Sequence, residues 1–236
     1  MSVPAMDLAA SRRRLAIEAA GVLAAPVAFG LVYGLAARQA GLTLVESLAM
    51  SVFVLAGASQ FAAVGLLDAG AGWLVIVLLT AALNARHLLY GAAMAPLMAH
   101  LPRWRRALLA YLLVDEVFGL SLAQAKRLGG RFDTRGYLVA AAFICLPWPI
   151  ATAAGHLGAA AIGDPARLGL DVVFPAAMAG LAVALMTGRR DVVAAVVGVA
   201  TAVVIGLAVH PSAGVVAGGL LGPLAGLALP ARKAQA

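Results

Sequence analysis

Uninterrupted apolar runs of about 18 residues or more recur along most of this chain, and they constrain its fold more than any other feature. Lipid offers no hydrogen-bond partner to an open backbone, so a spanning chain must be a helix bundle or a closed barrel. A barrel would show segments of about ten residues with alternating polarity. These runs are instead continuous and rich in Ala, Leu, Val and Gly. The sequence therefore predicts an all-α integral membrane protein.

The apolar runs predict about eight transmembrane helices in a single polytopic membrane domain, residues 1–236. A basic cytoplasmic segment, residues 1–14, is expected before the first helix, and residues 231–236 are expected to form a short C-terminal tail. The expected helices cover residues 15–37, 44–67, 72–99, 105–127, 135–161, 170–187, 191–209 and 211–230.

Basic residues between the helices predict the orientation. With eight helices and a cytoplasmic N-terminus, eleven Lys and Arg lie inside and five lie outside. This excess favours cytoplasmic termini. The cluster at 103–106 is an exception because it falls outside. A re-entrant early hairpin would move it inside and leave seven spans, but it would also move the 126–135 cluster out, so eight spans are preferred over seven.

The net charge of +7 does not indicate a nucleic-acid partner, because the basic residues lie between the apolar runs rather than on one face. The single Cys145 excludes a disulfide framework and does not favour a thiolate metal site. The sequence contains no zinc-protease motif, glycine-rich nucleotide loop or nucleophile elbow. We therefore expect no enzyme activity, cofactor or metal, and a lipid bilayer as the surroundings.

Two prolines indicate a possible inverted repeat of three-helix units. Pro26 lies in PVAFGLVYG and Pro175 in FPAAMAGLA, and each begins a group of three expected helices. The two proline-containing helices are five spans apart, so they would run in opposite directions, as in transporters whose broken helices mark the substrate site. The alternative is that these prolines have no common origin, since proline is frequent in membrane helices.

The stretch Thr80–Gly91, TAALNARHLLYG, interrupts an apolar run with polar side chains. A charge in hydrocarbon costs about 2.5–3.5 kcal/mol or more, so such residues are functional-site candidates. On a helix, Asn84 and His87 share one face, while Arg86 and Tyr90 share another. Both faces cannot contact lipid, so a hydrated cavity or a nearby acid is expected. The alternative places Arg86 near a membrane end, where its side chain reaches the headgroups.

Asp115 and Glu116 are the candidate acids, because they lie near the middle of the run 105–127. They point about 100° apart around a helix, so one of them is expected to face the bundle centre. Pairing with Arg86 or His87 would lower the cost of burying each charge. A carboxyl or imidazole there could also carry a coupling proton. The alternative is an ion pair that serves helix packing alone.

A second polar interruption contains Gly57, Ser59, Gln60 and Phe61. Glycine and small polar residues in mid-span can break a helix and expose backbone groups to a ligand such as an amino-acid carboxylate. The alternative is that Ser59 and Gln60 hydrogen-bond between helices, which is common in membranes.

The last expected helix carries a glycine strip at every fourth position, and such a strip lets another backbone approach closely. Its partner, within the chain or outside it, stays open from the sequence. The single polar residues Glu46, His156 and Asp171 are interpreted as solvated or locally satisfied. The glycine strip consists of Gly214, Gly218, Gly222 and Gly226.

The sequence resembles the AzlC-type family, the large subunits of two-component branched-chain amino-acid permeases and exporters. The matching stretches include GASQF (57–61), NARHLLYG (84–91), DEVF (115–118) and LGLDVVFPA (168–176), and their order makes the match specific. The resemblance implies a transporter of hydrophobic amino acids in the cytoplasmic membrane, commonly an exporter. It also implies a small companion membrane subunit of the AzlD type.

The residues and the resemblance together lead to one hypothesis, an ion-gradient-coupled secondary transporter of branched-chain or similar hydrophobic amino acids. The substrate would be bound by Gly57, Ser59, Gln60, Phe61, Asn84, Arg86 and Tyr90, and the proton-coupling or charge-pair residues would be His87, Asp115 and Glu116. The alternative is a non-transporting membrane assembly subunit, in which the buried charges hold the helices together and the glycine strip docks a partner.

Overall fold

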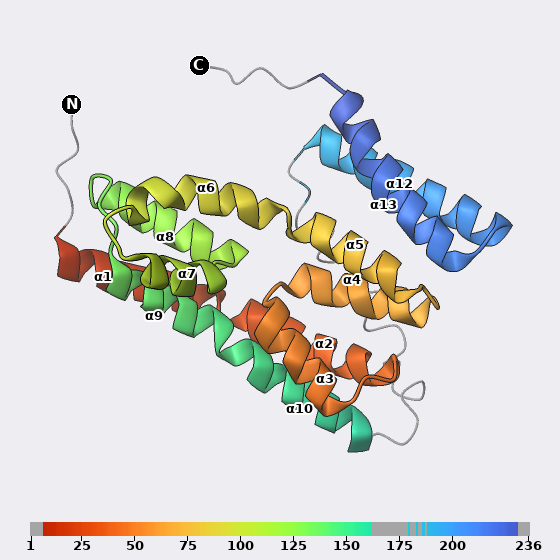
Figure 1. Ribbon diagram of the computed structural model, residues 1–236, viewed down its shortest axis with the longest axis horizontal. Helices are drawn as coiled ribbons and strands as arrows, with labels where there is room; N and C mark the ends of the chain where they lie inside the picture. The colour runs from red at the N-terminus through yellow and green to blue at the C-terminus, as the bar shows by residue number, and fades with distance from the viewer. Residues whose placement is uncertain (1–6, 162–178, 180–182, 184–185, 187, 231–236) are drawn as a thin grey trace. The chain divides into compact units, whose positions relative to one another are not determined.

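The computed structural model describes residues 7–161 and 188–230, together with positions 179, 183 and 186. Helices make up the regular structure of this described chain, and no strand occurs in it (Figure 1). The helical membrane class is thus confirmed. The residues group into two compact units, 1–60 with 81–165, and 61–80 with 166–236, and each is described by itself. The expected helix 170–187 with Pro175 lies outside the described residues, so the inverted repeat stays a prediction.

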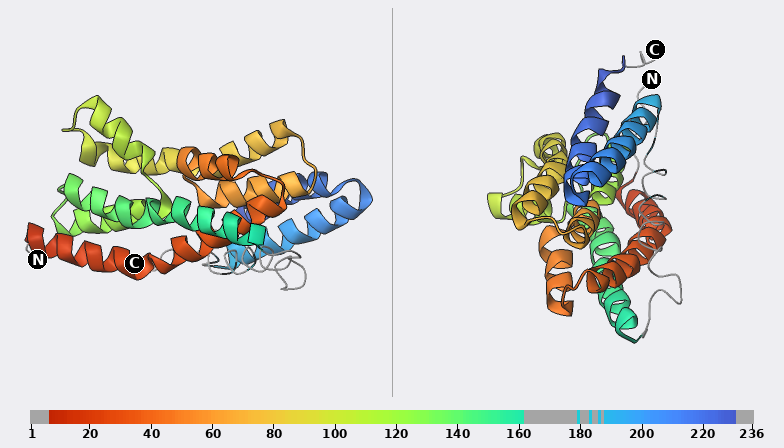
Figure 2. Two further views of the ribbon diagram at one scale, coloured as in Figure 1. Left: turned by 90° about the horizontal axis from the view of Figure 1, so that it is seen from below. Right: turned by 90° about the vertical axis from the view of Figure 1, so that its right-hand side faces the viewer.

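Two long, bent rods form the base of the first unit. One consists of α1 (Leu8–Val22) and α2 (Ala24–Gln39), and the other of α9 (Thr134–Cys145) and α10 (Pro147–Ala161). In each rod a single residue separates the two helices: Leu23 lies between α1 and α2, and Leu146 lies between α9 and α10. Helix α1 packs on α9 and α2 packs on α10, so the rods lie side by side (Figure 2).

Glycines bring α2 and α10 into backbone contact. A Cβ added at Gly34 would overlap the carbonyl of Thr152, and one added at Gly155 would overlap the carbonyl of Leu31. Small residues at such a crossing let membrane helices approach closely.

Helix α1 begins at Leu8, earlier than the expected start at residue 15, so residues 8–14 are helical. The Asp7 side chain accepts hydrogen bonds from the backbone N–H groups of Ala9 and Ala10, which satisfies donors that a helix start leaves open. Two of the basic residues in this first part of α1 are paired, Arg12 with Asp133 and Arg14 with Glu18 of the same helix.

Two ion pairs connect α1 to α8 (Asp115–Arg127) and to the start of α9. The Arg12 guanidinium donates to both oxygens of Asp133, at 2.6 and 2.7 Å. Arg127 donates to both oxygens of Glu18, at 2.9 and 3.1 Å. Asp133 also N-caps α9 by accepting from Gly136 N–H at 3.1 Å. The pKa of Asp133 is lowered, chiefly because Arg12 hydrogen-bonds to its charged form.

The expected helix 44–67 is interrupted in its middle. It forms α3 (Leu44–Ala49), a π-helical turn η1 (Met50–Val54) and α4 (Gly57–Asp68). Leu55 lies between them with a φ of 45°, in the left-handed region that non-glycine residues rarely adopt. The helix therefore ends at the π turn and starts again at Gly57.

Two other expected helices are also interrupted. The helix 72–99 forms α5 (Trp73–Asn84) and α6 (Arg86–Met98), with Ala85 between them. The helix 105–127 forms α7 (Arg103–Tyr111) and α8, separated by Leu112–Val114. Buried side chains of α6, α7, α8 and α9 pack together in one apolar cluster, which includes Met94, Leu109, Val117 and Tyr137.

Four helical stretches in the described residues are long and apolar enough to cross a membrane, which supports a membrane protein but not the count of eight. The expected spans 44–67 and 105–127 are absent from this set, because their interruptions leave shorter helices. The four stretches are Leu8–Gln39, Trp73–Met98, Thr134–Ala159 and Arg189–Ala208.

In the second unit, α12 (Arg189–Ala208) and α13 (Pro211–Ala228) form an antiparallel hairpin, the pair of blue helices in Figure 1. The glycine strip of α13 faces α12. A Cβ at Gly218 or Gly222 would overlap the carbonyl of Gly198 or Ala194, respectively. The strip therefore packs within the chain, which answers the question that the sequence left open.

Candidate functional site

The three interruptions are connected by polar side chains in the first unit. Ser59, just after the first interruption, hydrogen-bonds to Asn84 at the second. Arg86, just after the second, forms an ion pair with Asp115 at the third. Tyr111, just before the third, donates to the carbonyl of Val52 at the first. Residues far apart in the sequence thus meet where three helices change direction.

The first contact, between Ser59 and Asn84, is partly buried. Ser59 Oγ donates to Asn84 Oδ1 at 2.7 Å, and the Ser59 side chain is inaccessible to solvent. Asn84 is the last residue of α5, so this bond fixes the end of one helix against the start of α4. The bond is the interhelical contact that the sequence analysis gave as an alternative role for Ser59.

Gln60 holds the first interruption together. Its Nε2 donates to the carbonyl of Met50 at 3.0 Å, and its Oε1 accepts from Trp148 Nε1 at 2.9 Å. The Met50 carbonyl lies at the π turn, where regular helix bonding fails. The fully buried Gln60 amide therefore satisfies polar groups of the protein itself.

Trp148 also explains why residue 57 is glycine. A Cβ at Gly57 would lie 2.7 Å from Cη2 of the Trp148 ring, which leaves no room for a larger residue. Sequence reasoning missed Trp148. Its only distinctive signal was its place between Pro147 and Pro149, in the middle of an apolar run.

Asp115 is the centre of the second contact. Arg86 Nη2 lies 3.0 Å from its Oδ2, and the Tyr90 hydroxyl donates to its Oδ1 at 2.7 Å. Phe118 stacks on the Tyr90 ring at a centroid distance of 4.4 Å. Asp115 thus has one partner on each oxygen, and an aromatic pair covers one side. The pairing of Arg86 with an acid, predicted from the sequence, is present.

The positions of Arg86 and Asp115 along their helices explain why they pair. Both are first residues of a helix, α6 and α8, where the backbone presents a partial positive charge. This partial charge stabilises the Asp115 carboxylate and destabilises the Arg86 guanidinium. The carboxylate of Asp115 therefore compensates the positive charge of Arg86 at the start of α6. The sequence placed both in the middle of continuous helices, which the interruptions contradict.

This charged pair is accessible, unlike the polar residues around the first interruption. The side chain of Arg86 is 31% exposed and that of Asp115 is 42% exposed, whereas Ser59 and Gln60 are fully buried. The Nε of Arg86 is buried without a hydrogen-bond partner in the described part of the protein. A ligand with an acceptor could reach the exposed part of the guanidinium, which has more N–H donors than the ion pair with Asp115 uses.

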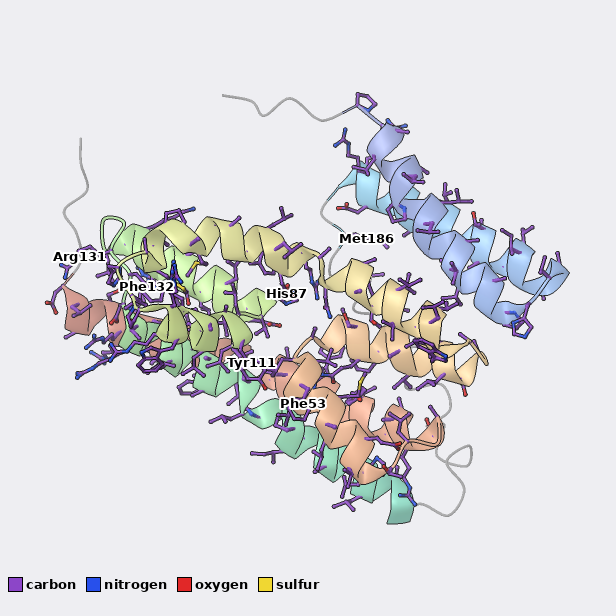
Figure 3. All side chains as sticks on the ribbon, in the orientation of Figure 1. Phe53, His87, Tyr111, Arg131, Phe132 and Met186 are labelled. Carbon is purple, nitrogen blue, oxygen red and sulfur yellow. The ribbon has the colours of Figure 1, made fainter. Side chains whose placement is uncertain are left out.

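The remaining candidates lie around this centre. The His87 Nδ1 is 3.0 Å from the carbonyl oxygen of Asn84, and its ring lies edge-on to Tyr90 at 5.5 Å. Figure 3 labels the His87 side chain. Glu116 is exposed and has no ion pair within the described chain. Phe61 is buried in α4 and belongs to the second unit. The structure thus brings together Ser59, Asn84, Arg86, Tyr90 and Asp115, with His87 adjacent.

Comparison with known proteins identifies relatives that share this region. The family described as "AzlC protein" matches residues 21–162, which include every member of the site. An inner membrane protein, YgaZ, from Escherichia coli is 34% identical over 119 residues, which cover 50% of this chain and 47% of the relative. The chain thus matches about half the length of that protein.

A second relative covers more of the sequence. An uncharacterized membrane protein from Archaeoglobus fulgidus is 31% identical over 201 residues, which cover 84% of this chain and 85% of the relative. An uncharacterized membrane protein from Helicobacter pylori is 35% identical over 100 residues, 42% of this chain and 43% of the relative. No solved structure matches. The chain belongs to the AzlC family of membrane proteins.

Proposed function

We propose that this chain is a secondary transporter, and not an enzyme, that exports branched-chain or similar hydrophobic amino acids across the cytoplasmic membrane. It would be driven by an ion gradient and would work with a small AzlD-type membrane subunit. Its AzlC membership and membrane-protein relatives support a transport-related role. The single observation that carries the proposal is the accessible Arg86–Asp115 pair where three interrupted helices meet.

The chemistry of the pair suits an amino acid. A zwitterion has a carboxylate and an ammonium group a few ångströms apart, and the pair offers a cation and an anion at a similar spacing. We assign the substrate carboxylate to Arg86, whose Nε has no partner in the described chain, and the ammonium group to Asp115. A charge-assisted hydrogen bond from the exposed part of the guanidinium to the substrate carboxylate would contribute about 1.5–3 kcal/mol.

Other residues would position or enclose the substrate. Tyr90 and Phe118 stack beside Asp115 and offer an apolar surface to an aliphatic side chain. Asn84 and the segment 57–61 would maintain the shape of the first interruption. Ser59 and Gln60 already hydrogen-bond to protein groups there, so they are not assigned to the substrate. This assignment makes Ser59 and Gln60 positioning residues.

Ion coupling would use the same centre. A proton on Glu116 would lower the negative charge near Arg86 and make the guanidinium more available to the substrate carboxylate, while a proton on Asp115 would compete with the substrate ammonium group. His87 lies beside this centre, and its imidazole is a second group that could carry a proton. Proton movement would thereby change the affinity for substrate, as secondary transport requires.

Counterflow of labelled valine in vesicles tests the proposal, with and without the small subunit. Arg86→Ala and Asp115→Asn should each lower valine counterflow at least about tenfold, because each removes a charged contact of about 1.5–3 kcal/mol. Arg131→Ala is the matched control, since Arg131 is exposed in the α8–α9 connection. Unchanged counterflow in both site variants would contradict the proposal.

A second candidate function, a non-transporting assembly subunit, is favoured by one observation. Arg86 and Asp115 also fix the start of α6 against the start of α8. The charge exchange Arg86→Asp with Asp115→Arg separates the candidates, because it keeps an ion pair but reverses its polarity. Loss of counterflow with normal complex yield supports the transporter. Recovery of both yield and counterflow supports the assembly subunit.

A further inference from the structure

A groove between α6 and α7 lies in the first unit and has no part in the proposed transport site. Its volume is about 330 Å³. Met94, Met98 and Leu113 are buried side chains that form its apolar floor. The space exists because the facing residues, among them Ala95 and Ala107, are small.

One end of the groove is cationic. Arg103 and Arg106, one turn apart in α7, are the charged residues that line it. No carboxylate lines the groove, and neither arginine forms an ion pair with an acid in the described parts of the chain. The groove therefore combines two uncompensated positive charges with an apolar floor.

The helix that carries these arginines has the character of a membrane-interface helix. Its 9 residues extend for about 13.5 Å, which is too short to cross a hydrocarbon core of about 30 Å. On the face away from the groove, Trp104 is 65% exposed and Leu108 is 51% exposed. The Arg105 guanidinium lies 5.1 Å from the Trp104 ring centroid. Tryptophan and arginine on a short amphipathic helix are typical of the headgroup region.

We propose that this groove is a binding site for an anionic phospholipid. The phosphate would lie between Arg103 and Arg106, because guanidinium groups bind phosphate through paired hydrogen bonds. An acyl chain would lie along Met94 and Met98, whose flexible side chains adapt to an irregular chain. A free amino acid fits less well, because the lining has no carboxylate for its ammonium group. The site does not depend on the proposed transport function.

Native mass spectrometry of the purified full-length protein tests the site, with phosphatidylglycerol as the probe and phosphatidylcholine as the comparison. The parent protein should retain phosphatidylglycerol in preference to phosphatidylcholine. Arg103→Gln with Arg106→Gln should weaken its binding about 30-fold, since each basic residue near an anionic headgroup contributes a factor of about five. Arg105→Gln is the matched control, because it removes a charge from the same helix outside the groove and should keep most of the affinity.

A second variant tests the apolar part without changing charge. Ala95→Trp fills the groove and should also weaken phosphatidylglycerol binding, while thermal melting and gel filtration confirm that it folds. Three results would overturn the site: equal retention of the two lipids by the parent protein, full retention by both groove variants, or displacement of phosphatidylglycerol by valine. If the double arginine variant does not fold, Ala95→Trp decides the outcome.

Discussion

The interrupted helices of the first unit and the α12–α13 hairpin of the second are held together by different kinds of contact between helices. Both are built mainly from apolar residues, yet the hairpin helices are continuous and meet through glycines. The interrupted helices instead meet through side-chain hydrogen bonds and an ion pair. Shape complementarity therefore holds one region, and matched polar groups hold the other. The polar arrangement also leaves the Arg86–Asp115 pair accessible to a ligand.

The largest effect is expected from Gln60→Ala, which breaks the polar arrangement at its buried centre. The substitution leaves both the Trp148 N–H and the Met50 carbonyl without their partner. Two unsatisfied buried groups at about 1–3 kcal/mol each predict a loss of about 2–6 kcal/mol. Thermal unfolding of both proteins in detergent measures this loss of stability. Ala62→Gly, in the same helix, is the control for helix propensity, and a loss no larger than the control's would contradict the structure.

The next effect tests the close packing of the hairpin. Gly218→Ala places a methyl group against the Gly198 carbonyl, whereas a Cβ at the neighbouring Gly219 has its nearest neighbour, Leu79 Cδ1, at 3.8 Å. Overpacking predicts a loss of about 1–3 kcal/mol for Gly218→Ala. Gly219→Ala should be neutral or slightly stabilising, because alanine favours a helix. Equal melting temperatures for the two variants would show that α12 and α13 are not packed through this strip.

A smaller effect is expected from Tyr90→Phe, which removes one polar contact and keeps the aromatic stack. Asp115 loses the hydrogen bond on Oδ1 but keeps Arg86 on Oδ2. The expected loss of stability is about 0.5–1.5 kcal/mol. The double-mutant cycle of Tyr90→Phe with Asp115→Asn measures the coupling directly. Additive effects would mean that the two side chains do not interact.

The smallest effect is the pH dependence of the stability that the ion pair between Arg12 and Asp133 contributes. This contribution should change only in acid. The folded pKa of Asp133 lies below its unfolded value of about 3.9. The pair therefore stabilises the fold fully above that value, and this contribution is lost as the pH falls through the folded pKa. The difference in melting temperature between the parent protein and Asp133→Asn should accordingly shrink below about pH 4. A constant difference from pH 7 to pH 3 would contradict the pairing.

Sequence reasoning recovered the helical membrane class and the partnership of Arg86 with an acid, because both follow from the cost of polar groups in lipid. It did not find where the helices stop. Leu55, Ala85 and Leu112–Val114 carry no helix-breaking residue type. The interruption at Leu55 lies beside tertiary contacts of Gln60 with Met50 and Trp148, which the sequence did not reveal. The glycine strip was visible, but its partner on α12 required the three-dimensional structure.

The Gln60 side chain has a further consequence, which concerns the difference between an amide and an acid. Its NH₂ group faces a carbonyl acceptor and its oxygen faces an indole donor, so the two ends must be of opposite kind. Glutamate has almost the same shape but presents oxygen at both ends, and its ionised form would repel the Met50 carbonyl. Exchanging one nitrogen for one oxygen would therefore turn an attractive contact into a repulsive one. At this position shape and size do not suffice, and the direction of the dipole selects the residue.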